Sequence, residues 1–302
     1  MTLELSVIVP IYNEGPALRG NLQHISEYLS RSFPEHEIIG VDDGSTDETP
    51  KVLQECEREV PRLRFLRSPE NRGKGMAVRL GIDRARGTWV ALVDADLELP
   101  IEMLEEFFRV QRATGAQVVV GSKRHPASQV EYPRLRWFLS RAYGRLLRVL
   151  FELPVSDTQV GFKLLHRPTV QSLSPALLVK RFAFDVELIV LLHRAQARFA
   201  EAPVRLHFSR PGGGRVRLPT VLNIVRETAG IWFRLYITGF YGRPRVPAAP
   251  APASPLGGGS RSSESTRESA GSALEPLPGP PRASPEALAP RTGAPKGPSP
   301  PA

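Results

Sequence analysis

The sequence has little of what disulfide-stabilised or membrane-spanning proteins need. Its 302 residues include one cysteine, Cys56, which cannot form a disulfide within the chain and is typical of a reducing compartment. No uninterrupted apolar run reaches the roughly 20 residues of a membrane-spanning helix. The first residues enter a strand pattern, LELSVIVP, without a charged leader or a cleavage motif, so we expect no secretory signal. Together these absences predict a cytoplasmic protein.

Acidic side chains are the minority among the charged residues. Lys and Arg number 40 against 31 Asp and Glu, and the formal net charge at pH 7 is +9. Most of this excess lies before residue 243. A basic protein is expected to bind an anionic partner, which leaves a nucleotide, a lipid phosphate, a membrane surface or a nucleic acid open.

Residues 243–302 contain few apolar side chains larger than alanine and about half of the chain's 30 prolines. A segment built from Pro, Ala, Gly and Ser cannot bury enough apolar surface to offset the entropy of ordering it. We therefore predict a disordered tail at 243–302 and a folded domain over residues 1–242.

In the remaining part, continuously apolar strand patterns alternate with helical patterns. LSVIVPI, HEIIGVD and GTWVALVD are typical of buried strands, and the spacing of Leu18, Leu22 and Ile25 is typical of a helix between two of them. This alternation predicts an α/β fold with a mainly parallel, Rossmann-like sheet that helices cover on both faces.

Polar clusters follow three of the predicted strands: Asn13-Glu14, Asp42-Asp43 and Asp94-Asp96. Ligands of parallel sheets bind at the carboxyl ends of the strands, so these clusters mark the expected site. If the third strand persists, Asp94 and Asp96 point to one face, where two carboxylates repel each other unless a cation lies between them. The pattern fits a Mg²⁺ or Mn²⁺ site. It also fits a polar strand end in which an Asp caps the next helix.

The NRGKG segment at 71–75 resembles a phosphate-binding loop in composition but has neither Walker spacing nor a GxGxxG pattern. Its two glycines are expected to relieve backbone strain before the following helix.

Residues 134–153 and 219–242 predict two amphipathic helices. Arg141, Arg145 and Arg148 share one face of the first helix, among aromatic and leucine side chains. A solvated charged face would explain such a row, whereas arginines beside aromatics and without acidic partners favour a helix at a membrane interface. The charged residues of the second segment make a membrane span too costly, so we expect it to lie on the membrane or to pack on the domain.

Seven motifs together resemble the inverting family-2 glycosyltransferases of the GT-A fold, and among these the polyprenyl-phosphate (dolichyl-phosphate) glucosyl- and mannosyltransferases. They occur in family order across residues 5 to about 235: SVIVPIYNE (6–14), VDDGSTDET (41–49), NRGKGMAVRLGIDRARG (71–87), VDADLELP (93–100), VVVGSKR (118–124), VSDTQVGFKLL (155–165) and FAFDVEL (182–188). The DTQ-GFK pattern is closer to the glucosyl type than to the mannosyl type. The chain departs from the family at Lys123, where relatives usually have Arg, and at Val160, where glucosyl-type members commonly have Cys.

The resemblance implies roles for individual residues. The nucleotide-sugar pocket is implied at Pro10, Tyr12, Glu14, Asp43, Lys74 and Asp94, with Asp43 reading the base. The DxD motif implies a Mg²⁺ or Mn²⁺ site at Asp94 and Asp96, with Asp96 the main ligand and Glu98 a further candidate. Near the phosphates the resemblance places Lys123 and Arg124. Contact with the acceptor phosphate is expected from Arg141 and from Arg210, Arg215 and Arg217 of a basic, glycine-rich loop.

The implied activity is transfer of a hexose, glucose or mannose, from a UDP- or GDP-sugar to a polyprenyl phosphate on the cytoplasmic face of the membrane. A phosphate acceptor is already anionic and needs no general base. The enzymatic alternative is a hydroxyl acceptor on a glycolipid or polysaccharide, which needs a base, and Asp157 is then the candidate.

A non-enzymatic alternative is a protein that only binds a nucleotide sugar or a nucleic acid. The acidic strand ends would repel a phosphate backbone, so we expect no nucleic-acid partner. Some relatives add transmembrane helices after the catalytic domain, where this chain has its proline-rich tail. The two amphipathic helices or a membrane-anchor subunit would then have to supply attachment to the membrane.

Overall fold

A computed structural model of the protein describes residues 3–130, 134–181, 183–206 and 218–242. The predicted tail at 243–302 lies outside the described residues, so its disorder and the boundary of the folded domain stay predictions.

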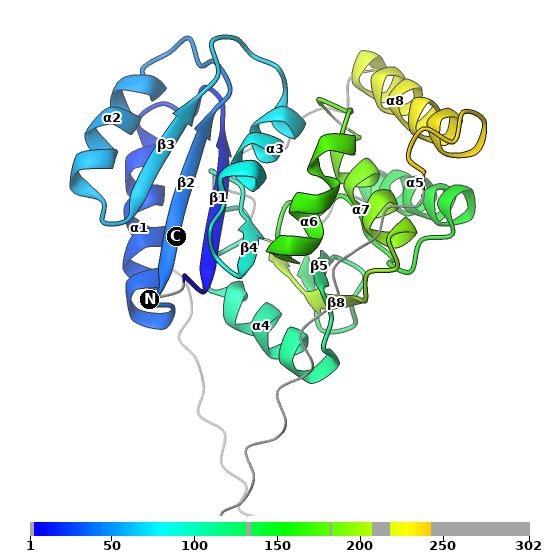
Figure 1. The fold of residues 1–302 in the computed structure, drawn as a ribbon, viewed down its shortest axis with the longest axis horizontal. Coiled ribbons are helices and arrows are strands. Elements are labelled where there is room, and N and C mark those ends of the chain that lie inside the picture. The colour runs from blue at the N-terminus through cyan, green and yellow to red at the C-terminus, as the bar shows by residue number, and fades with distance from the viewer. Residues whose placement is uncertain (1–2, 131–133, 182, 207–217, 243–302) are drawn as a thin grey trace, which may run out of the picture. The chain divides into compact units, whose positions relative to one another are not determined.

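The core of the fold is a seven-stranded sheet with the order β3-β2-β1-β4-β7-β5-β8 (Figure 1). Only β7 runs antiparallel to its two neighbours, and the other pairs of this sheet are parallel. The mainly parallel sheet predicted from the apolar strand patterns is therefore confirmed. The strands are β1 (Leu5–Ile11), β2 (His36–Asp42), β3 (Leu63–Arg67), β4 (Trp89–Leu92), β5 (Val118–Ser122), β7 (Lys163–His166) and β8 (Phe199–Pro203). A separate two-stranded sheet joins β6 (Gln129–Val130) to β9 (Arg205–Leu206).

Helices cover both faces of the sheet, as the alternating pattern predicted. The side chains of β1 alternate between two hydrophobic cores, with Val7 and Val9 in one and Ile8 in the other. The first core includes α1 (Ala17–Ser32), α2 (Thr49–Glu59) and α4 (Met103–Thr114). The second includes α3 (Lys74–Arg84), α5 (Arg134–Phe151), α6 (Arg167–Leu173), α7 (Phe184–Arg194) and α8 (Leu218–Tyr236), and a short 3₁₀ turn, η1 (Ser174–Ala176), follows α6.

The carboxyl ends of the central strands meet at one edge of the sheet. Ile11 pairs with Asp42 across β1 and β2, and the backbone N–H of Asp43 donates to the carbonyl oxygen of Ile11 at 2.9 Å. On the other side of β1, the N–H of Val93 donates to Ile8 at 3.0 Å. The segments that follow β1, β2 and β4 are thus brought together.

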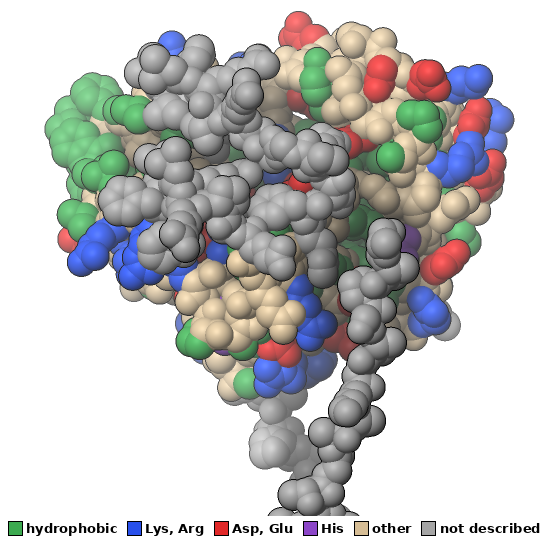
Figure 2. Space-filling view, turned by 180° about the vertical axis from the view of Figure 1, so that it is seen from behind, with side chains coloured by type: hydrophobic (Ala, Val, Ile, Leu, Met, Phe, Trp, Pro, Cys, Tyr) green, Lys and Arg blue, Asp and Glu red, His purple; other side chains and the backbone are tan. Residues whose placement is uncertain are grey.

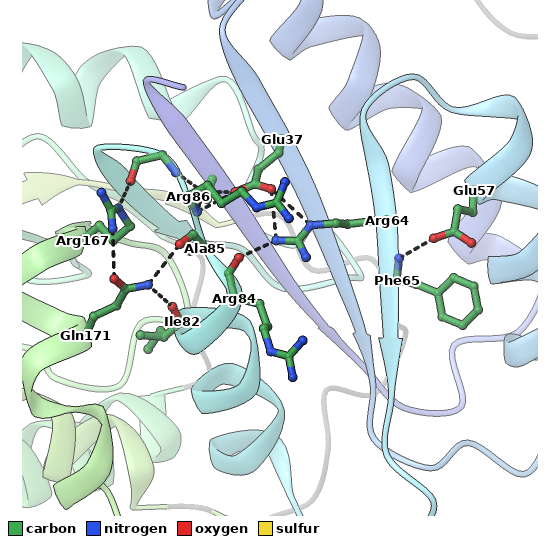
Figure 3. Close-up of polar contacts among 12 residues, drawn as sticks. Glu37, Glu57, Arg64, Phe65, Ile82, Arg84, Ala85, Arg86, Arg167 and Gln171 are labelled. Atoms are coloured by element: carbon green, nitrogen blue, oxygen red, sulfur yellow. Dashed lines mark hydrogen bonds and ion pairs between the residues drawn. The ribbon is translucent and has the colours of Figure 1, made fainter. Parts of the chain in front are cut away.

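The opposite, amino-terminal edge is joined by side chains (Figure 3). Glu37 at the start of β2 accepts a hydrogen bond from the N–H of Arg86 at 2.7 Å and pairs with Arg64 at 3.1 Å. The side chain of Gln171 donates to the carbonyl oxygens of Ile82 (2.8 Å) and Ala85 (3.0 Å) at the end of α3. The polar groups of this edge satisfy one another and the backbone, which indicates a structural role.

The two helices predicted at 134–153 and 219–242 are present as α5 and α8. They lie against each other, because the Tyr143 hydroxyl is 2.8 Å from the Thr228 hydroxyl and the Tyr236 hydroxyl donates to the carbonyl of Leu150 at 3.0 Å. None of the helices in the described residues combines the length and apolar content that a bilayer crossing requires.

Two helical glycines predict opposite effects on stability. Gly20 in α1 has no atom within 4 Å of an added Cβ, whereas an added Cβ at Gly81 in α3 would lie 2.5 Å from the Cγ2 of buried Ile8. Gly20→Ala should raise the free energy of unfolding by up to about 1 kcal/mol, since alanine loses less backbone entropy in a helix. Gly81→Ala should lower it by about 1–3 kcal/mol through overpacking. Urea denaturation would measure both, and equal signs would contradict the packing of α3 on β1.

Candidate functional site

A cavity of about 610 Å³ opens at the carboxyl ends of β1, β2 and β4. All six residues expected to contact the nucleotide sugar line it, together with Asp96. The lining residues are Pro10, Ile11, Tyr12, Glu14, Asp43, Asn71, Gly73, Lys74, Ala77, Asp94, Ala95, Asp96, Gln159, Arg181, Asp185 and Ile224. The structure therefore brings together side chains from distant parts of the sequence, and Pro10 and Ile224 are more than 200 residues apart. We call it the donor cavity.

Asp94 and Asp96 reach this cavity by a turn. The strand β4 ends at Leu92, so the strand alternation assumed from the sequence does not extend to the two carboxylates. The N–H of Leu97 donates to the carbonyl of Asp94 at 3.3 Å, and Leu97 has a left-handed φ of 50°. A non-glycine residue at positive φ is strained, and such strain is often found at functional sites.

The carboxylate of Asp94 lies between the side chain of Lys74 and the backbone at Gly161. Its Oδ1 lies 2.5 Å from Lys74 Nζ at the start of α3, and a Cβ added to Gly161 would lie 1.9 Å from its Oδ2. Burial raises the pKa of the Asp94 carboxyl, but the charge and hydrogen bond of Lys74 and the charge of Lys163 outweigh it and lower that pKa. Burial lowers the pKa of Lys74, and the charges of Asp94 and Asp185 outweigh it in turn and raise it. Both groups are therefore charged at neutral pH.

The donor cavity is rich in negative charge. Five carboxylates line it against two cationic side chains, Lys74 and Arg181. No group of three His, Cys, Asp or Glu side chains in the described part of the chain is arranged to hold a metal ion by itself. Mg²⁺ and Mn²⁺ are commonly held by one or two carboxylates with substrate phosphates completing the coordination, and the donor set of Asp94 and Asp96 fits such an ion.

Asp96 and Glu98 differ in their fit to this role. Asp96 lines the cavity, and its Oδ1 accepts the N–H of Glu98 at 3.2 Å. Glu98 is not among the residues that line the cavity, so its predicted role as a ligand has less geometric support.

Asp43 organises the loop before α3. Only 3% exposed, it accepts the N–H of Arg72 at 2.9 Å through Oδ1 and the N–H of Gly73 at 2.7 Å through Oδ2. Each carboxylate oxygen has a second lone pair, so the side chain retains acceptor capacity for a nucleobase N–H. The predicted base contact is compatible with this geometry, but the loop contacts were not foreseen.

The predicted residues Lys123, Arg124, Asp157 and Arg141 line a second, smaller pocket of about 120 Å³, with Ser128, Val130 and Ser140. We call it the cationic pocket, because three of the four charged side chains that line it are positive. Lys123 Nζ lies 3.4 Å from Asp157 Oδ2, and Arg124 Nη2 donates to the carbonyl of Ser140 at 2.8 Å.

Two buried polar atoms of this pocket lack hydrogen-bond partners among the described residues, Arg124 Nη1 and Asp157 Oδ2. Burial lowers the pKa of Arg124, and the positive charges of Arg148 and Arg141 lower it further. The negative charge of Asp157 raises this pKa but does not outweigh the burial. A buried donor without a partner is costly, and an anionic ligand would satisfy it.

A single loop, residues 156–162, joins the two sites. Asp157 faces the cationic pocket, Gln159 lines the donor cavity, and Gly161 contacts Asp94. The sequence implied one set of residues for the donor and another for the phosphates and the acceptor, and the described members of these sets line two different pockets.

Gln159, Asp185, Arg181 and Ile224 are among the lining residues of the donor cavity that were assigned no role from the sequence. The first two lie in motifs that carried the resemblance, SDTQVGF and FAFDVEL, which was a usable signal. Asp185 is 2.5 Å from the fully buried Lys163. Arg181 and Ile224 reach the cavity through tertiary packing and have no local signature. The predicted loop residues Arg210, Arg215 and Arg217 lie outside the described residues.

Comparisons with known proteins agree with this geometry. Residues 6–173 match the sequence profile described as Glycosyl transferase family 2. A Dolichyl-phosphate beta-glucosyltransferase of Dictyostelium discoideum is 33% identical over 251 residues, which cover 78% of this chain and 76% of that protein. The enzyme of the same name from Mus musculus is 35% identical over 217 residues, 67% of each chain.

The fold is also similar to that of a solved GT-A structure. Glucosyl-3-phosphoglycerate synthase from Mycobacterium tuberculosis, solved in complex with Mn²⁺, uridine-diphosphate-glucose and phosphoglyceric acid, superposes with a TM-score of 0.55 at 19% identity, covering 76% of this chain and 78% of that one. The expected GT-A fold is confirmed. The profile match over more than half of the chain and the relatives above 30% identity show that the chain belongs to glycosyl transferase family 2.

Proposed function

We propose that the protein transfers glucose from a nucleotide-diphosphate sugar to a polyprenyl phosphate, with inversion at the anomeric carbon. The relatives named dolichyl-phosphate beta-glucosyltransferases support the sugar and the acceptor class. The observation that carries the proposal is the pairing of two sites of opposite charge on one loop, a carboxylate-rich cavity and a cationic pocket.

The donor cavity would bind the nucleotide sugar. Asp43 offers acceptor capacity to the base, and Lys74 and Arg181 offer positive charge to the diphosphate. Five carboxylates would repel a diphosphate, so a divalent cation is needed to offset the charge. Asp94 and Asp96 would hold Mg²⁺ or Mn²⁺, and the Mn²⁺ in the structural neighbour supports this choice. When bound, the ion supplies Lewis-acid stabilisation of the departing nucleoside diphosphate.

The cationic pocket would bind the acceptor phosphate. Arg124 Nη1 is a buried donor that lacks a partner among the described residues, and Lys123 and Arg141 add positive charge. An ionised phosphate oxygen attacks the anomeric carbon from the face opposite the leaving diphosphate, and this direction of attack gives inversion. Because the phosphate oxygen is already anionic, the attack needs no general base. The catalytic contribution of these residues is to bind and orient the two substrates.

A sugar hydroxyl as acceptor is the competing proposal. It would need Asp157 as a general base, but Asp157 is 4% exposed and ion-paired with Lys123. This arrangement favours the phosphate acceptor.

We also propose that the enzyme works as a peripheral protein on the cytoplasmic face of a membrane, through an apolar face on α8. Its exposed side chains recur at helical spacing and continue past the end of the helix: Val225, Trp232, Phe233, Tyr236, Ile237 and Phe240. Leu146 and Val149 of the adjacent α5 are exposed as well. Figure 2 shows hydrophobic side chains gathered at one side of the molecule, next to Lys and Arg side chains.

The chemistry of this apolar face fits a lipid surface. Tryptophan and tyrosine favour the membrane–water interface, and exposed arginines such as Arg145, Arg148 and Arg226 would attract anionic headgroups. In this proposal α5 and α8 supply the attachment to the membrane, in place of a membrane-anchor subunit.

The activity is tested by incubating purified protein with polyprenyl phosphate in detergent, Mn²⁺ and either labelled UDP-glucose or labelled GDP-mannose. We expect acid-labile, organic-extractable label from UDP-glucose, and none after EDTA treatment. Label that appears only in polar products with both donors would contradict the lipid acceptor.

The contact of Gly161 with Asp94 provides a second test. An added methyl group 1.9 Å from Asp94 Oδ2 must displace that carboxylate from Lys74. Gly161→Ala should therefore lower kcat/KM by about 100-fold or more, because small displacements of reacting groups have effects of this size. Gly20→Ala is the control, since it adds the same methyl group in open space. Full activity of the Gly161 variant would refute the assignment of Asp94.

Membrane binding is tested by sedimentation with vesicles of phosphatidylcholine, alone or mixed with phosphatidylserine, in the absence of substrates. Phe233→Glu should reduce partitioning onto the vesicles by roughly tenfold or more. The variant loses the about 1.5–3 kcal/mol of binding free energy that burial of the phenyl side chain in the membrane contributes. Gln54→Glu on α2, which also adds a negative charge at an exposed site, should bind as the wild type does. Equal binding of both variants would refute the apolar face as the docking surface.

A further inference from the structure

One wall of the donor cavity is formed by an irregular segment that precedes α7; its described residues are 177–181 and 183, and we call these residues segment 177–183. Arg181 of this segment lines the cavity. The carbonyl oxygen of Lys180 accepts the N–H of Gly75 at 2.8 Å, and a Cβ added to Gly73 would lie 2.4 Å from the same oxygen. Segment 177–183 is therefore in direct contact with the loop that carries Lys74.

Side chains hold the backbone of this segment. Glu187 of α7 is fully buried, and its Oε2 accepts the N–H groups of Leu178 at 2.8 Å and Val179 at 2.7 Å. Oε2 of Glu227 accepts the N–H of Ala183 at 2.8 Å. Backbone N–H groups away from water need partners, so the two carboxylates determine where segment 177–183 lies.

Both carboxylates connect the segment to α8. Glu227 belongs to that helix, and Oε1 of Glu187 accepts the Tyr241 hydroxyl at 2.5 Å and pairs with Arg234 at 3.5 Å. The inner face of α8 also carries Ile224, which lines the donor cavity. The same helix presents Trp232 and Phe233 to the outside. The helix thus has the proposed membrane face on one side and the wall of the donor cavity on the other.

We propose that Glu227 is a positioning residue for donor binding. By accepting the Ala183 N–H it fixes segment 177–183, and through it Arg181 and the Lys180 carbonyl that supports the Lys74 loop. The helix that would dock on the membrane would thereby also set the geometry of the donor cavity. This inference rests on the proposed function for the identity of the donor, but the positioning itself can be measured without any substrate.

The direct test compares Glu227→Ala with Glu227→Gln by hydrogen exchange in the absence of nucleotide. Alanine removes the acceptor, so amides in 177–183 and the Gly75 amide should exchange at least about tenfold faster. Glutamine keeps a carbonyl oxygen at the same place and should restore protection. Asn223→Ala, an exposed change on the same helix, is the control and should leave exchange unchanged.

The consequence for the donor is measured by titrating UDP-glucose in the presence of Mn²⁺. Glu227→Ala should raise the Kd for UDP-glucose by roughly five- to tenfold. It should also raise the KM for the donor by a larger factor than it lowers kcat. Binding to vesicles should stay as in the wild type. Unchanged exchange and Kd in Glu227→Ala would overturn the proposal, as would equal defects in the alanine and glutamine variants. A wild type that makes no lipid-linked product while Glu227→Ala still loosens the segment would refute the proposed function and leave the positioning role supported.

Discussion

The donor cavity depends on one close contact between two backbones, the hydrogen bond of 2.8 Å from the Gly75 N–H to the Lys180 carbonyl. Any side chain at position 73 or 75 would collide with the carbonyl of Lys180 or Val179. Because the contact forms, Lys74 starts its helix at the place where it can reach Asp94, and Arg181 lines the same cavity. The glycines of NRGKG therefore do more than the strain relief expected from the sequence, although Gly73 does have a φ of 98°.

The two pockets of the site differ in the sign of the charge that lines them. The donor cavity gathers carboxylates at the ends of parallel strands, and the cationic pocket gathers Lys123, Arg124 and Arg141 beside a single Asp157. Loop 156–162 contributes to both, so movement of that loop would alter the two sites together. Opposite charge in neighbouring sites favours a metal-bound diphosphate in one and a free phosphate in the other.

The sequence predicted the architecture well, because continuous apolar strands and amphipathic helices leave a periodic signal. It did not predict β7, since four buried residues, KLLH, carry no signal for the direction of the strand. A shared face for the Asp94 and Asp96 carboxylates was expected only if the strand persisted; β4 ends at Leu92, and a turn at Leu97 carries both residues to the donor cavity. Glu187 received no role from the sequence, since its partners at 178, 179, 234 and 241 are brought to it only by folding.

The reversed direction of β7 has a consequence for how this enzyme could change. The chain leaves the carboxyl edge of the sheet after Ser122 and returns to the same edge at Lys163, where Val120 and Lys163 pair. Residues 123–162, which include α5 and all the residues that line the cationic pocket, thus form one long excursion that begins and ends beside the donor cavity. Substitutions within this excursion need not disturb the register of the sheet. Apart from loop 156–162, which contributes to both sites, the topology separates the part that would recognise the acceptor from the part that would bind the nucleotide, so one can diverge while the other is kept.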